Sequence, residues 1–229
     1  MVALDNLAAL GQRPMSRLRL AFDQVNLLQF SLVGAIALTA AFLVLGTIAM
    51  NGFDANAFRL GSQTGWRFAS LVFFAVLAAG PIGRMVGRFW APAQLLEDHY
   101  PDLIWGFCAS YGVYLLAVLL PNAISLSGGA LLFVLFGAAV ICGMAVAAAP
   151  LRLSYGGAPL IGPAVRRAVL GTAMIYFWLC YSLMALQRIS GPHRPDAFYD
   201  TCILLMVFGL LLRFADRWTQ PRAAVAGPC

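Results

Sequence analysis

The feature that most constrains this chain is a series of six long runs of apolar residues. Each run reaches the ~17 residues that an α-helix needs, as a minimum, to cross the hydrocarbon core of a bilayer. Of the 229 residues, 62% are hydrophobic and 10% are charged, a balance that favours lipid over water as the solvent. The predicted spans cover residues 27–50, 67–89, 103–120, 129–149, 166–187 and 198–215.

These runs predict helices rather than the strands of a barrel. A lipid-facing barrel strand needs only ~10 residues of alternating pattern, whereas these runs are continuous and longer. A helix also satisfies its backbone hydrogen bonds within one segment, as hydrocarbon requires. Gly80-Pro81 predicts a kink, and Pro121 and Pro150 mark the ends of two spans. We expect an all-α polytopic membrane bundle of about six transmembrane helices with short connections, the first a loop at 51–65.

The distribution of arginine predicts that both termini lie in the cytoplasm. The chain has a net charge of +6, and its 15 basic residues are all arginines. With an even number of spans, the side that holds most of them also holds both ends, and the positive-inside rule places that side in the cytoplasm. The predicted inner arginines are Arg13, Arg17, Arg19, Arg84, Arg88, Arg152, Arg166, Arg167, Arg213, Arg217 and Arg222, and the outer ones are Arg59, Arg67, Arg188 and Arg194.

This topology divides the chain into three parts. Residues 1–26 form a cytoplasmic segment, either a short helix in the headgroup layer or a basic, poorly ordered terminus. Residues 27–215 form the six-helix transmembrane domain, and 216–229 a short cytoplasmic tail. Arginines beside apolar spans favour membrane lipids over nucleic acid as partners, in the cell inner (cytoplasmic) membrane. Aromatic residues near the predicted span ends agree with this placement: Trp66, Trp90, Trp105, Tyr199 and Trp218.

The spans lack the residue types that carry chemistry. Their inner parts hold no Asp, Glu, Lys, Arg or His, which membrane enzymes, pumps and ion-coupled carriers keep at depth. Asp200, near the start of the sixth span, is predicted to cap that helix. The five cysteines stand singly and are predicted to act as small hydrophobic residues, without metal or disulfide spacing. The sequence predicts no catalytic residue and favours a protein that is not an enzyme.

Mildly polar side chains recur on the third and fifth spans. Within each helix a spacing of three or four places several of them on one face. One interpretation is packing between helices through hydroxyl groups and small residues. The other is a pocket between the two spans for a lipid, a quinone or a similar apolar ligand. The possible ligand-facing residues are Ser110, Tyr111, Tyr114, Thr172, Tyr176 and Tyr181.

The two histidines predict neither a haem nor a metal centre. His99 and His193 fall on opposite sides of the membrane in the predicted topology, so they cannot ligate one iron together. His99 stands in an acidic stretch with Glu97, Asp98 and Asp102, which is either a cation site or a solvated loop. Neighbouring loop residues seldom converge on one ion without a supporting frame, so we favour the solvated loop.

Several short motifs over about residues 60–215 resemble the ferric reductase-like transmembrane family. Thr64-Gly65-Trp66 and Gly80-Pro81-Ile82-Gly83-Arg84 are similar to the opening and close of the family's second span. Leu103-Ile104-Trp105-Gly106-Phe107 resembles the start of its third span, and 166–176 the basic start of its fifth. The resemblance implies six spans with both ends inside. It also implies haem, but Leu116, Thr172 and Ala185 stand where the family offers its ligands, so we predict no cofactor.

Three functions follow from these observations. The first is a haem-free structural or partner subunit of a membrane system, with a membrane or periplasmic protein as its partner. An alternative is a small-molecule or lipid transporter, which the polar faces of the third and fifth spans motivate. A second alternative is a membrane oxidoreductase subunit. The absence of buried acids, bases and nucleophiles argues against the last.

Overall fold

The structure, a computed structural model, describes residues 13–87, 90–122, 128–148, 162–191 and 196–219. Within these ranges the regular structure is helical, with no strand. Six helices are long and apolar enough to cross a membrane, so the predicted all-α bundle is confirmed and the chain is an integral, multi-pass membrane protein. The helices are α2 (Arg13–Asn51), α3 (Ala55–Val86), α4 (Ala91–Asp98), α5 (Tyr100–Asn122), α6 (Gly128–Ala148), α7 (Pro163–Ile189) and α8 (Ala197–Thr219).

The first connection is much shorter than the loop predicted at 51–65. α2 ends at Asn51 and α3 begins at Ala55, so three residues join them. Gly52 and Phe53 have φ angles of 96° and 58°, which turn the chain sharply. Asp54 then caps α3, because its carboxylate accepts a hydrogen bond from the Ala57 N–H at 2.6 Å. The polar residues of 55–65 therefore form the first turns of a helix.

Two further local predictions are corrected. The acidic stretch around His99 is not a loop, because α4 ends at Asp98 and α5 begins at Tyr100. The cap of α8 is Asp196, whose side chain accepts from the Phe198 N–H at 3.3 Å, whereas Asp200 lies in the first helical turn. An N-cap accepts from the second or third N–H of its helix, so a residue already inside the helix cannot fill this role.

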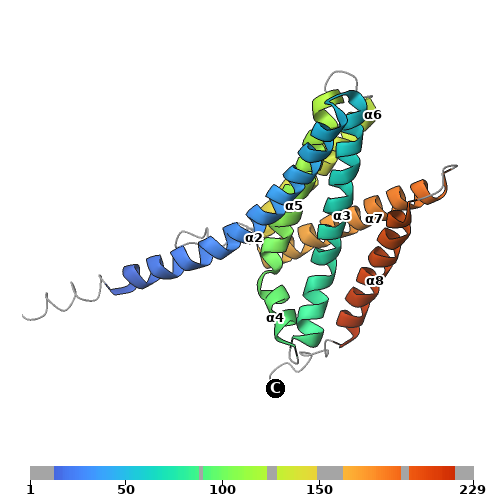
Figure 1. The fold of residues 1–229 in the computed structure, drawn as a ribbon. Coiled ribbons are helices and arrows are strands. Elements are labelled where there is room, and N and C mark those ends of the chain that lie inside the picture. Colours follow the sequence, from blue (N-terminus) through green and yellow to red (C-terminus); the bar gives the residue numbers. More distant parts are fainter. Residues whose placement is uncertain (1–12, 88–89, 123–127, 149–161, 192–195, 220–229) are drawn as a thin grey trace, which may run out of the picture.

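α3 is the central helix of the bundle. It packs against α2, α4, α5 and α8, and more lightly against α7 (Figure 1). The helix continues through Pro81 to Val86, although the proline removes one backbone donor. Trp66 is 6% exposed and lies in the core between helices. It joins a buried aromatic cluster that connects α3, α5, α7 and α8: Trp66, Phe73, Phe107, Tyr111, Phe177, Tyr181 and Tyr199.

Glycines allow the closest approaches between helices. A Cβ atom on Gly106 of α5 would lie 2.5 Å from Cδ1 of Ile36 in α2. A Cβ atom on Gly209 of α8 would lie 2.5 Å from Cδ2 of Leu77 in α3. Small residues at such positions let membrane helices reach van der Waals contact, which is a main source of their association.

We expect Gly106→Leu to destabilise the bundle by about 1–3 kcal/mol, the usual cost of overpacking a tight contact. Gly112→Leu on the same helix is the matched control, since nothing lies within 4 Å of a Cβ atom placed there. Unfolding in mixed detergent micelles measures both changes. Equal stability of the two variants would contradict the packing described for Gly106.

Candidate ligand pocket between α3, α7 and α8

The sequence-predicted polar residues do not form one group. The Tyr111 and Tyr114 rings of α5 lie 5.2 Å apart, and the Tyr111 ring lies 5.0 Å from Phe177 of α7. Tyr181 stacks on Phe73 of α3 at 5.5 Å. The structure thus brings Tyr111, Tyr114, Tyr176 and Tyr181 into or beside the aromatic cluster.

The other two predicted residues have different surroundings. Ser110 is fully buried, and its hydroxyl donates to the Phe107 carbonyl of its own helix at 2.9 Å. Thr172 is exposed on the outer face of α7. The hydroxyls of Tyr176 and Tyr181 are buried without a hydrogen-bond partner among the described residues. Whether a ligand reaches them stays a prediction.

His99 and Asp102 form a local pair at the junction of α4 and α5. The His99 Nδ1 lies 3.0 Å from an Asp102 carboxylate oxygen, and Asp102 is buried in the first turn of α5. Within the part of the chain that the structure describes, no three His, Cys, Asp or Glu side chains are close enough to hold a metal ion. The side chain of Glu97, and the whole of His193, lie outside the described residues.

The three positions that resemble the family's haem ligands have different surroundings. Leu116 of α5 is 58% exposed, Thr172 of α7 is exposed, and Ala185 is fully buried. Because none of these side chains ligates iron, we expect protein purified from its native membrane to show no Soret absorption band, even after incubation with hemin. A Soret band at near-stoichiometric intensity would contradict this prediction.

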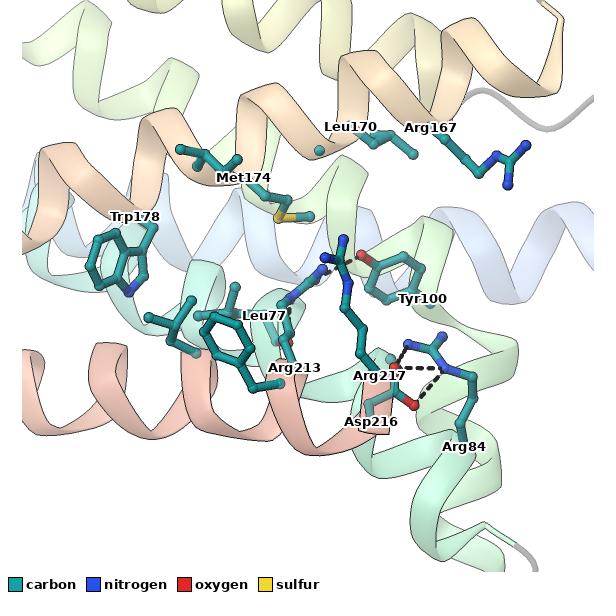
Figure 2. A pocket seen from close by; sticks show the side chains of 15 residues that line it. Leu77, Arg84, Tyr100, Arg167, Leu170, Met174, Trp178, Arg213, Asp216 and Arg217 are labelled. Carbon is teal, nitrogen blue, oxygen red and sulfur yellow. Dashed lines mark hydrogen bonds and ion pairs between the residues drawn. The ribbon is translucent and has the colours of Figure 1, made fainter. Parts of the chain in front are cut away.

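A pocket that sequence reasoning did not predict lies between α3, α7 and α8. Its volume is about 640 Å³, within the usual range for small-molecule sites. One end is apolar and the other is rich in arginine, as Figure 2 shows. It is lined by Leu77, Gly80 and Arg84 of α3, Tyr100 of α5, Arg167, Leu170, Gly171, Met174, Ile175 and Trp178 of α7, and Leu210, Arg213, Phe214, Asp216 and Arg217 of α8.

Arg84 forms a bidentate ion pair that joins α3 to α8. Its Nη2 lies 2.6 Å from Oδ2 of Asp216, and its Nε lies 3.1 Å from Oδ1 of the same carboxylate. The Asp216 side chain is only 7% exposed, whereas that of Arg84 is 43% exposed. A planar guanidinium matches a carboxylate in this two-bond geometry, so the pair fixes the relative position of the two helix ends.

Arg213 satisfies a backbone carbonyl of α3 that Pro81 leaves without a donor. Pro81 has no N–H, so the carbonyl of Leu77, four residues earlier, lacks its usual helical donor. The Nε of Arg213 donates to that carbonyl at 3.2 Å, and its Nη2 donates to the Tyr100 hydroxyl at 3.3 Å. Freed carbonyls in membrane helices need such a partner, because hydrocarbon offers none. Arg213 is therefore held by α3 and α5.

Gly80 makes the space that these contacts need. A Cβ atom at this position would lie 3.4 Å from Nη1 of Arg84 and 3.7 Å from the Tyr100 ring. The Gly80-Pro81 pair thus opens one wall of the pocket and leaves the Leu77 carbonyl without a helical donor, so that Arg213 can bind it. The sequence predicted a kink at Gly80-Pro81, but it did not predict that Arg213 of α8 binds there.

Arg167 and Arg217 are the two arginines of the pocket that no other helix engages. Arg217 is exposed and bonds to no atom of the described residues, and Arg167 donates only to the Pro163 carbonyl in its own first turn, at 3.3 Å. With Arg84, Arg213 and Asp216 they give the pocket a net charge of +3 when the aspartate is ionised. The polar end can therefore attract and hydrogen-bond an anion.

The apolar end is formed by long side chains of α7 and α8. Met174, Trp178 and Leu210 line it, and Ile175 and Phe214 lie on the exposed surface at its edge. The Trp178 Nε1 donates to the Met206 carbonyl at 3.0 Å, so its indole is held in place between the two helices. From Arg167 to Trp178 the pocket follows α7 for eleven residues, or about 16 Å at the rise of an α-helix.

Comparison with known proteins finds no relative of this chain. No protein-family model matches the chain, and neither a curated protein nor a solved structure matches it. The ferric reductase-like resemblance and the roles that it implies therefore stay predictions.

Proposed function

We propose that this integral membrane protein binds a lipid-like amphiphile with an anionic headgroup in the pocket between α3, α7 and α8. The observation that carries the proposal is a pair of guanidinium groups, those of Arg167 and Arg217, that bind no other helix among the described residues and stand at the polar end of a hollow whose other end is apolar. Arginine is suited to phosphate and carboxylate groups, because its planar donors bind two oxygens at once.

The apolar end favours a lipid over a water-soluble anion. Ile175 and Phe214 border the hollow on the face of the bundle that lies toward lipid, so a hydrocarbon chain can reach Met174 and Trp178 from the bilayer. The polar end lies among the helix ends that hold most arginines. If these are the cytoplasmic ends, as the positive-inside rule predicts, the pocket opens at the leaflet that carries anionic lipids.

Lipid binding by purified protein tests the proposal. We expect native mass spectrometry to show phosphatidylglycerol retained more strongly than phosphatidylcholine. Arg167→Gln and Arg217→Gln should each weaken retention at least about tenfold, since one charged hydrogen bond is worth ~1.5–3 kcal/mol. Both side chains are exposed, so neither change should disturb folding.

Arg59→Gln and Arg188→Gln are the matched single controls, because each removes one charge from an exposed arginine outside the pocket. Competition with inorganic phosphate distinguishes a lipid ligand from a soluble anion. Phosphate should not displace a bound lipid, whereas it should displace a bound soluble anion. Equal retention by the pocket variants and the control variants would overturn the proposal.

A further inference from the structure

The three helices that border the pocket are joined again at their opposite ends. Arg67 of α3 forms an ion pair with Asp196, the cap of α8, at 2.7 Å. The Arg67 guanidinium carbon also lies 5.3 Å from the centre of the Phe198 ring and 5.6 Å from that of Tyr199, within the range of cation–π attraction. We call this group, with Trp66 and Tyr181, the α3–α7–α8 seal.

Trp66 connects all three helices within the seal. Its ring lies 5.6 Å from Tyr181 of α7 and 5.6 Å from Tyr199 of α8, with Phe198 at 6.1 Å. Tyr181 and Trp66 are buried, so the aromatic part of the seal is packed. The ion pair is more open, with side-chain exposures of 36% and 50%, and exposed pairs of this kind are weak.

A tight contact separates the seal from the pocket. Leu77 of α3 touches Gly209 of α8 so closely that a Cβ atom there would lie 2.5 Å away. Trp178 of α7 holds the backbone of α8 at Met206. The same three helices are thus fixed to one another near the middle, hollow at one end and shut at the other. A site that is open at one end and closed at the other is one state of alternating access, in which one group of helices rocks against another.

We infer that the protein carries its anionic amphiphile across the bilayer along α3, α7 and α8, with the Arg67–Asp196 pair as the gate of the seal. This inference rests on the proposed function, since the cargo is the ligand of the pocket. The movement is passive and follows the concentration gradient of the lipid. Opening requires that the half-exposed ion pair separates, that Trp66 parts from its ring contacts on the neighbouring helices, and that α8 tilts about its contact with Leu77.

A reversible lock on the gate tests the inference. Arg67→Cys and Asp196→Cys are introduced together, with the five native cysteines replaced by serine or alanine, and the protein is reconstituted in phosphatidylcholine vesicles containing fluorescent phosphatidylglycerol. Dithionite quenching measures how fast the labelled lipid leaves the inner leaflet. A short bifunctional methanethiosulfonate then links the two cysteines, and a reductant releases them in the same sample.

We expect the linked protein to lose transport and to regain it after reduction, while lipid retention by the pocket stays unchanged. Undiminished transport in the linked state would overturn the inference and leave the binding proposal intact. Loss of retention in Arg167→Gln/Arg217→Gln with unchanged transport would also overturn it, because the cargo would not pass through the pocket. A native protein that retains no anionic lipid would instead contradict the proposed function.

Discussion

Replacing Arg84 by glutamine is expected to cost about 3 kcal/mol of stability, the lower part of the ~3–5 kcal/mol seen when one partner of a buried ion pair is removed. The cost arises at Asp216, whose carboxylate is 7% exposed and loses its bidentate partner. It falls at the lower end because Arg84 itself is 43% exposed. SDS-induced unfolding in mixed micelles, followed by circular dichroism, measures the change.

The two partners should not be equivalent. Asp216→Asn keeps a polar side chain opposite an arginine that is already 43% exposed to solvent, so we expect a loss of only about 1 kcal/mol. The double variant Arg84→Gln/Asp216→Asn should be more stable than Arg84→Gln alone, because it no longer buries the aspartate charge without the Arg84 guanidinium. If the two single variants lost the same stability, and the double variant lost the sum of the two, the carboxylate would not be desolvated.

Replacing Arg213 by leucine is expected to destabilise the bundle by about 2 kcal/mol, within the ~1–3 kcal/mol cost of leaving a buried polar group without its partner. The group concerned is the Leu77 carbonyl, which Pro81 deprives of a helical donor and Arg213 satisfies at 3.2 Å. Leucine keeps most of the apolar stem, so the lost hydrogen bonds dominate the effect.

Pro81→Ala provides the test of this explanation. Alanine restores an N–H four residues after Leu77, so the carbonyl regains a donor within α3. Arg213→Leu should then cost at least ~1 kcal/mol less in the Pro81→Ala background than in the native chain, a coupling in the range usual for residues of one hydrogen-bond network. Independent, additive effects would rule out the role assigned to Arg213.

The number and type of the helices could be predicted because hydrocarbon leaves few choices. A continuous apolar run must be a helix, and its length fixes one crossing. The same rule explains why the start of α3 was missed: it detects a helix only where the run is apolar. Asn56, Arg59 and Ser62 lower the apolar content of the stretch without ending the helix. The capping carboxylate of Asp54 was the available signal, because Asp is a preferred N-cap residue.

The faces of α7 show how far periodicity reaches. Its buried stripe repeats every four residues through Ala173, Phe177, Tyr181 and Ala185. Thr172 stands one position away from this stripe and is exposed, although its polarity had grouped it with the tyrosines. A helical period predicts which residues share a face, but it does not indicate which face meets the neighbouring helices.

The pocket was beyond sequence reasoning because it depends on contacts between distant segments. Arg213 and Leu77 are 136 residues apart in the chain, and Arg84 and Asp216 are 132 apart. Before the fold is known, each of these arginines is simply a basic residue near a span end, which predicts topology and nothing more. Only the packing of α8 against α3 shows that Arg84 and Arg213 bind other helices. Among the described residues, Arg167 and Arg217 bind no other helix.

The length of α3 has a consequence for the surrounding bilayer. Its 32 residues extend about 48 Å, whereas the hydrocarbon core is only ~30 Å thick. An ordinary tilt of ~20° shortens the projection by only a few ångströms, so the helix as a whole is longer than the core that it crosses. The polar first turns of α3, with Asn56, Arg59 and Ser62, can therefore extend into the headgroup layer and beyond, where their side chains meet water.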